Sequence, residues 1–231
     1  MQRDVKCGPM PWLVLLPTIS FIWLVATVLI GAALAPGYQH AGQFMSELGA
    51  VGAPHALWVN LLGYLVVELW ALAFFVLAWR AAPRALLSHW GFAVLGFYAV
   101  CLVAGALFSC DINCRPTVPS VTHEVHMLAG GLAYLSAVVG VLLTAFAARQ
   151  WRGGSYLFWT GMVAAGLVLG LLLALDPDSP WVGARQRLLE TTLYLWFIFL
   201  GITLYRQGPA APVAAPTEAG ATPEVQAHTS V

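Results

Sequence analysis

The stretch that decides the fold is residues 12–35, WLVLLPTISFIWLVATVLIGAALA, which contains no charged residue. At 1.5 Å per residue, an α-helix of this length crosses the roughly 30 Å of hydrocarbon in a bilayer. The run is longer than the hydrophobic part of a signal peptide, so we expect a retained helix. Five similar apolar stretches follow at 56–79, 87–109, 125–148, 156–174 and 188–205. The sequence therefore predicts six transmembrane helices.

The composition supports a chain that faces lipid. Hydrophobic residues make up 60% of it and charged residues 9%, with a mean hydropathy of +0.81, whereas soluble domains carry about 25% charged residues. Unpaired backbone groups are costly in hydrocarbon, so spanning segments are helices or closed barrels, and these runs are too long and too continuously apolar for barrel strands. We predict an all-α polytopic membrane bundle over residues 1–207, with membrane lipid as its partner. The net charge is zero without a basic block, so we expect no nucleic-acid partner.

The distribution of Lys and Arg predicts the orientation, because cytoplasmic loops are enriched in these residues. With the N-terminus inside, seven basic residues lie on the inner side and three on the outer side. The inner ones are Arg3, Lys6, Arg80, Arg84, Arg149, Arg152 and Arg206, and the outer ones Arg115, Arg185 and Arg187. We therefore expect both termini to be cytoplasmic, in a prokaryotic plasma (cell inner) membrane. Residues 208–231 are rich in Ala and Pro, and we expect a disordered cytoplasmic tail there.

Polar side chains gather in the predicted outer loops and adjoining helix ends, so we expect the functional site there. The candidate cluster consists of Ser46, Glu47, Asn60, Asp111, Ser120, His123, Arg187 and Glu190. An alternative for Ser46 and Glu47 is that they only hydrogen-bond to backbone amides of a folded loop. Which residues would be catalytic is left open.

The second outer loop contains the pattern C-x3-C-x8-H-x2-H, formed by Cys110, Cys114, His123 and His126. Two cysteines four residues apart on the oxidising side of a membrane favour a disulfide. In that case Asp111, His123 and His126 remain as a possible metal triad, with zinc as the candidate ion. The alternative is that the histidines only make hydrogen bonds. Ser120 is a typical N-cap for the helix that carries both histidines.

Two carboxylic acids lie inside the predicted spans. In the last span, which we expect to begin near residues 178–180, Arg187 and Glu190 are three residues apart and are predicted to pair or to form a site. Glu68 lies in the apolar middle of the second span, where we favour a polar contact between helices over a proton path.

Several of these residues resemble the signatures of a prokaryotic membrane family known as domain of unknown function 998. The first signature is similar to residues 46–54 with Asn60, the second to residues 108–114 with Ser120 and His123, and the third to Arg187 with Glu190. The likeness covers roughly residues 11–207 and extends more distantly to the DRAM/FRAG-like eukaryotic membrane proteins. It implies a six-helix membrane protein and no particular activity.

Three hypotheses follow from the sequence. The first is a membrane protein without enzymatic activity, whose outer polar cluster binds a ligand, a lipid headgroup or a partner. The second is a membrane-embedded metal-dependent hydrolase, in which Glu190 or Glu47 would serve as acid and base beside a metal held by the triad. The third is a small transporter, which the absence of an evident internal repeat weakens.

Overall fold

The computed structural model describes residues 10–207, and every regular element in that range is helical. Six helices are long and apolar enough to cross a membrane, which confirms the predicted number of spans. They are α1 (Trp12–Ala33), a second span made of α2 (Ala56–Trp58), η2 (Val59–Tyr64) and α3 (Leu65–Ala81), α4 (Leu86–Leu107), α5 (Val121–Ala148), α6 (Ser155–Leu173) and α7 (Val182–Gln207). Short 3₁₀ helices η1 (Met45–Gly49) and η3 (Ile112–Cys114) lie in the connections. The tail predicted at 208–231 lies outside the described residues.

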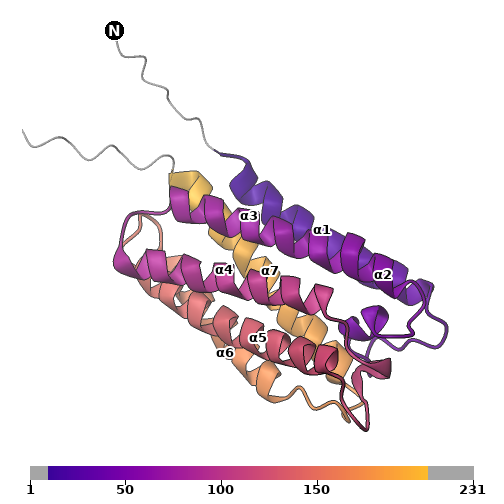
Figure 1. Cartoon of the computed structure of the whole chain (residues 1–231). Helices are drawn as coiled ribbons and strands as arrows, with labels where there is room; N and C mark the ends of the chain where they lie inside the picture. Colours follow the sequence, from indigo (N-terminus) through magenta and orange to yellow (C-terminus); the bar gives the residue numbers. More distant parts are fainter. Residues whose placement is uncertain (1–9, 208–231) are drawn as a thin grey trace, which may run out of the picture.

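The six spans form a closed antiparallel ring. Each packs against the span before and after it in the chain, and α7 closes the ring by packing against α1. In Figure 1, α1 begins and α7 ends at the same end of the bundle. The three longer connections, 34–55, 108–120 and 174–181, lie at the opposite end, which we call the long-loop end. Residues of these loops, among them Phe44, Ser46 and Pro177, line the inside of the ring at this end.

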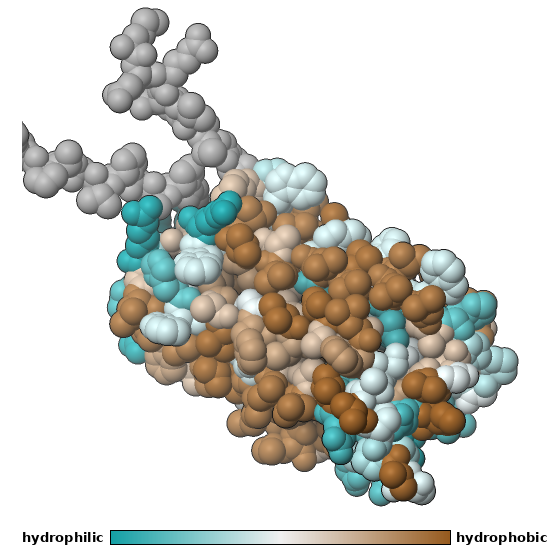
Figure 2. Space-filling model, viewed as in Figure 1, coloured by the Kyte–Doolittle hydropathy of each residue, from teal (hydrophilic) through white to brown (hydrophobic). Residues whose placement is uncertain are grey.

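Hydrophobic side chains cover the middle of the bundle. Figure 2 shows apolar residues across the central part of the visible face, with hydrophilic residues gathered toward the two ends. The exposed apolar side chains include Ile22 on α1, Leu62 on the second span, Phe97 on α4 and Leu195 on α7. Soluble monomers rarely expose contiguous apolar patches on this scale. The surface therefore matches a multi-pass membrane protein.

Two helices begin ahead of their apolar runs, close to the starts that their capping residues predicted. Helix α5 starts at Val121, where the Ser120 hydroxyl caps the helix by accepting a hydrogen bond from the His123 N–H at 3.2 Å. Helix α7 starts at Val182, after residues 178–180 and ahead of the predicted apolar run from 188. In both cases the first turns are polar, so a hydropathy pattern excludes them although their backbone is helical. These polar turns lie at the long-loop end.

The second span contains a π-helical segment, η2, in which the usual helical hydrogen-bond pattern is widened. The indole N–H of Trp23 on α1 donates to the Leu62 carbonyl within this segment at 2.8 Å. Gly63 lies so close to Thr27 that an added Cβ would collide with the Thr27 side chain. The irregular segment is thus held directly against α1. Such segments are frequent at functional sites.

Candidate functional site

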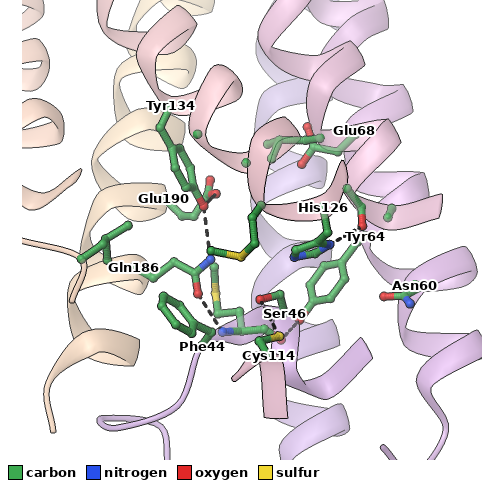
Figure 3. A pocket seen from close by; sticks show the side chains of 18 of the residues that line it. Phe44, Ser46, Asn60, Tyr64, Glu68, Cys114, His126, Tyr134, Gln186 and Glu190 are labelled. Carbon is green, nitrogen blue, oxygen red and sulfur yellow. Dashed lines mark hydrogen bonds between the residues drawn. The ribbon is translucent and has the colours of Figure 1, made fainter. Parts of the chain in front are cut away.

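A cavity of about 280 Å³ lies inside the ring, toward the long-loop end. All six spans contribute to its wall, and segments of the long loops add Phe44, Met45, Ser46, Cys114 and Pro177. Its volume is close to the lower limit of about 300 Å³ for small-molecule sites. Figure 3 shows the polar side chains that face it, with Glu190 and Tyr134 on one side and Glu68 on the other.

The residues that line the cavity recur at four-residue intervals along the helices. They are Asn60, Tyr64 and Glu68 on the second span, Leu102 and Ala106 on α4, His126, Gly130 and Tyr134 on α5, and Gln186 and Glu190 on α7. Residues four apart lie on the same side of an α-helix. Each of these helices therefore presents one continuous stripe to the cavity, and three of the stripes carry polar groups.

Glu190 is held by two tyrosines. The hydroxyl of Tyr134 donates to one carboxyl oxygen at 2.7 Å, and the hydroxyl of Tyr98 donates to the other at 3.3 Å. Gln186, one turn before Glu190, donates to the Tyr134 oxygen at 3.3 Å and accepts from the Met45 backbone N–H at 2.7 Å. This arrangement suits a carboxylate, which can only accept hydrogen bonds. It also ties η1 to the wall of the cavity.

Glu68 is the one carboxylic acid at the cavity that the protein leaves without a partner. Its side chain is 5% exposed. Among residues 10–207, no donor or acceptor lies within hydrogen-bond distance of its Oε2 atom. An interhelical polar contact, as favoured from the sequence, is therefore not formed by that oxygen. A buried polar atom without a partner is unusual in a native protein and calls for an explanation.

The ion pair between Arg187 and Glu190, one of the two alternatives predicted for these residues, is not formed among the described residues. The Nη1 atom of Arg187 donates to the carbonyls of His40, Gln43 and Gly183, and Nη2 donates to the Tyr38 hydroxyl. Within the described range, the single ion pair joins Arg115 to Glu47. Arg187 lies at the start of α7, where free carbonyls of the first long loop are within its reach. Burial raises the pKa of Tyr38, with Arg187 acting in the opposite direction.

Glu47 stabilises the first long loop. One of its carboxyl oxygens accepts from the Phe44 backbone N–H at 2.9 Å and lies 3.3 Å from Nη1 of Arg115. The other oxygen accepts from the side-chain amide of Gln43 at 2.8 Å. Its geometry therefore corresponds to the alternative in which this acid binds backbone amides of a folded loop.

Ser46 and Asn60 do face the cavity. The Ser46 hydroxyl lies 3.7 Å from the Cys114 sulfur. The Asn60 amide donates to the Gly49 carbonyl at 2.8 Å and to the Ser109 hydroxyl at 3.0 Å. Asn60 thereby joins the first two long loops at the edge of the cavity.

Asp111, Ser120 and His123 form a separate group outside the cavity wall. Both carboxyl oxygens of Asp111 accept from Ser120, one from its hydroxyl at 2.7 Å and one from its backbone N–H at 2.8 Å. These hydrogen bonds lower the pKa of Asp111. The Asp111 backbone N–H donates to Nδ1 of His123 at 3.2 Å. The group fixes the second long loop on the first turn of α5.

The structure does not gather the predicted metal ligands. Cys110 and Cys114 form a disulfide, while Nδ1 of His126 faces the carbonyls of Gly105 and Phe108 at 2.9 and 2.8 Å. Carbonyl oxygens can only accept, so this nitrogen carries a proton. Throughout residues 10–207, no three His, Cys, Asp or Glu side chains are grouped so that they could hold a metal ion. Zinc binding by Asp111, His123 and His126 thus stays a prediction without a preformed ligand group.

Four residues of the site were not predicted from the sequence: Tyr64, Tyr98, Tyr134 and Gln186. All are single polar groups in apolar helices, and none belongs to a familiar motif. The available signal was their spacing, because Tyr64 precedes Glu68 by four residues and Gln186 precedes Glu190 by four. A polar stripe within a spanning helix indicates a face that does not contact lipid.

Comparison with known proteins identifies the family and nothing more specific. The family model described as "Protein of unknown function (DUF998)" matches residues 18–203, which include all of the cavity lining. Neither a curated protein nor a solved structure matches the chain. Since the family model covers most of the chain, this protein belongs to the DUF998 family of proteins of unknown function.

Proposed function

We propose that this protein is a membrane-embedded binding protein that takes a small amphiphilic molecule into the cavity within its ring. The observation that carries the proposal is the unpartnered Glu68 carboxyl, which faces a cavity whose opposite wall presents Glu190. A carboxyl group costs several kcal/mol to bury without a partner. A bound ligand would supply the missing contact and offset that cost.

The mixed character of the wall supports an amphiphile. Leu24, Leu102, Leu172 and Leu175 give the cavity apolar surfaces. The polar groups lie on the stripes of the second span, α5 and α7, so a ligand could place one polar end against them and an apolar end against the leucines. Small-molecule sites are commonly built in this way, with few polar groups on a largely apolar surface.

We further propose that the long-loop end faces away from the cytoplasm, with both termini inside and the protein in a prokaryotic plasma membrane. Within the described residues, Arg80, Arg84, Arg149, Arg152 and Arg206 lie at or near the short-loop end. At the long-loop end, each of the three arginines binds backbone carbonyls: Arg115 those of Gly42 and Pro177, Arg185 that of Ala174, and Arg187 those described above. The excess of free cations at the short-loop end favours a cytoplasmic location for it.

Binding of hexan-1-ol tests the proposal. The protein is placed in phosphatidylcholine nanodiscs, and saturable binding is measured by saturation-transfer NMR. Gly130 lines the cavity, and an added Cβ would meet nothing within 4 Å, so Gly130→Leu fills the cavity without displacing backbone. Gly166 on α6 has equally open surroundings but lies outside the cavity, which makes Gly166→Leu the matched control.

We expect saturable binding in the wild type and in Gly166→Leu, and its loss in Gly130→Leu. Equal signals from all three proteins would mean that the alcohol only dissolves in the lipid, and the proposal would then be wrong.

Fusions of alkaline phosphatase to the C-terminus test the orientation, because this reporter is active only outside the cytoplasm. An active fusion would contradict it.

A further inference from the structure

We infer that the ligand of this cavity carries an ammonium group on a short apolar body; this inference rests on the proposed function. The reason is that the protein uses up most hydrogen-bond donors at the cavity internally and leaves acceptors free. The ligand must then supply donors. A protonated amine supplies up to three, together with a positive charge.

Most side-chain hydrogen-bond donors near the cavity already donate to acceptors of the protein. The hydroxyls of Tyr134 and Tyr98 are spent on Glu190, and that of Tyr64 donates to the Met45 carbonyl at 2.6 Å. The Asn60 amide is spent on Gly49 and Ser109. The Ser46 hydroxyl donates weakly to the disulfide sulfur of Cys114, so one N–H of Gln186 is the donor that remains along this part of the wall.

The acceptors remain available. Glu68 Oε2 receives no hydrogen bond, and each oxygen of Glu190 receives a single one of the two or so that a carboxylate oxygen accepts. The Oδ1 atom of Asn60 adds an uncharged acceptor, since the contacts of this residue involve its nitrogen. The free groups at the cavity are thus two acids, an amide oxygen and Nε2 of His126, whose Nδ1 is occupied by backbone carbonyls.

The charges favour the same ligand. The cavity lining contains two glutamates and no Lys or Arg. The arginines of the long-loop end bind loop carbonyls and do not reach the wall. Two carboxyl groups facing one low-dielectric space repel each other when ionised, and a cation between them relieves this repulsion. An anionic ligand would add a third negative group without a partner.

The rest of the wall limits the size of the ligand. The volume of about 280 Å³ and the leucine side chains fit a compact apolar body, and the cavity lies below the usual range of drug-sized sites. Ordered water is the competing occupant, because a cavity of this size can hold several molecules with hydrogen bonds to its acids. Water would satisfy the acceptors without selecting between charged and uncharged amphiphiles.

Three six-carbon probes separate these possibilities: hexylammonium, hexan-1-ol and hexanoate. Binding to the wild type in phosphatidylcholine nanodiscs is measured at neutral pH, and the signal from Gly130→Leu is subtracted to remove partition into lipid. We expect hexylammonium to bind at least about tenfold more tightly than hexan-1-ol, as for one charge-assisted hydrogen bond. Hexanoate should bind most weakly.

Variants of the two acids test whether Glu68 and Glu190 cause the preference for hexylammonium. Glu68→Gln and Glu190→Gln should each weaken hexylammonium binding by at least about tenfold, and hexan-1-ol binding by less than about threefold. Retained binding of the alcohol also shows that the variant is folded. Glu124→Gln, at an exposed position on α5 outside the cavity, is the matched control and should change neither affinity.

The possible failures are distinguishable. If hexan-1-ol or hexanoate binds as tightly as hexylammonium, or if both glutamine variants retain the preference for the ammonium, the inferred ligand class is wrong while the binding function stands. If no probe shows saturable binding that Gly130→Leu removes, the proposed function itself is wrong, and water is the occupant of the cavity.

Discussion

Gly183→Ala should loosen the first long loop from the start of α7. Gly183 is buried in the first turn of that helix. An added Cβ would lie 2.6 Å from the His40 carbonyl oxygen and closer still to that of Gln43, whereas real Cβ atoms essentially never approach within 3.0 Å. The obstructing atoms are backbone, so the loop has to move away. This movement separates the two carbonyls from Arg187.

The magnitude follows from these contacts. Arg187 donates to the His40 and Gln43 carbonyls at 2.6 and 3.1 Å, and a displacement of several tenths of an ångström takes the longer bond past the range of useful geometry. A hydrogen bond to a charged group contributes about 1.5–3 kcal/mol, and partial exposure reduces this. Alanine regains up to about 1 kcal/mol of helix propensity. We expect a net loss of about 1–3 kcal/mol.

Thermal unfolding in detergent, followed by tryptophan fluorescence, measures this loss. At about 2–4 °C per kcal/mol for a protein of this size, the midpoint should fall by about 2–12 °C. Gly170→Ala on α6 is the matched control, because its Cβ would meet nothing within 4 Å and no loop packs there. If Gly183→Ala were as stable as Gly170→Ala, the loop would not be held against α7 as described.

Three further changes test the long-loop end by the same unfolding measurement. Asn60→Ala removes two hydrogen bonds and should cost about 1–3 kcal/mol; a loss within the 0.5 kcal/mol or so of a neutral surface substitution would contradict its role. The lowered pKa of Asp111 contributes stability that is present above its unfolded pKa of about 3.9 and is lost as the pH falls through the folded value. Asp111→Asn should therefore flatten the fall of the midpoint below about pH 4, and an unchanged acid slope would exclude this residue as its source. Replacing Cys110 and Cys114 by serine should lower the free energy of unfolding by about 1–2 kcal/mol, since the closed loop is short; reductant should bring the wild type to the same value and leave the variant unaffected.

The spans could be predicted from the sequence because each is a long apolar run, and hydrocarbon permits few alternatives to a helix. The first turns of α5 and α7 lie outside the apolar runs, so they had to be predicted from capping residues, Ser120 for α5 and residues 178–180 for α7. The family resemblance rested on residues that the structure uses mainly as scaffold, such as Glu47, Asp111 and Arg187. These residues could be recognised from the sequence because they belong to short motifs of closely spaced positions.

The cavity was harder to foresee because it depends on how the six spans turn toward one another. Arg187 and Glu190 are close in sequence, yet one faces loop carbonyls and the other faces tyrosines of α4 and α5. Spacing alone cannot decide between such partners. The stripe of Asn60, Tyr64 and Glu68 lies on a span with a π-helical segment, which changes the register that a regular helix would predict.

The most direct test of the account asks whether water reaches Gly130 from the long-loop end. In a background in which Cys7 and Cys101 are serine, Gly130→Cys and Gly166→Cys each place a thiol where an added Cβ meets nothing within 4 Å. A trimethylammonium methanethiosulfonate reagent, which does not cross lipid, is added outside intact cells, and labelling is measured by mass spectrometry. We predict that Gly130→Cys is labelled and that Gly166→Cys, which faces lipid on α6, is not. An unlabelled Gly130→Cys, or equal labelling of both positions, would contradict a cavity that opens to the outside.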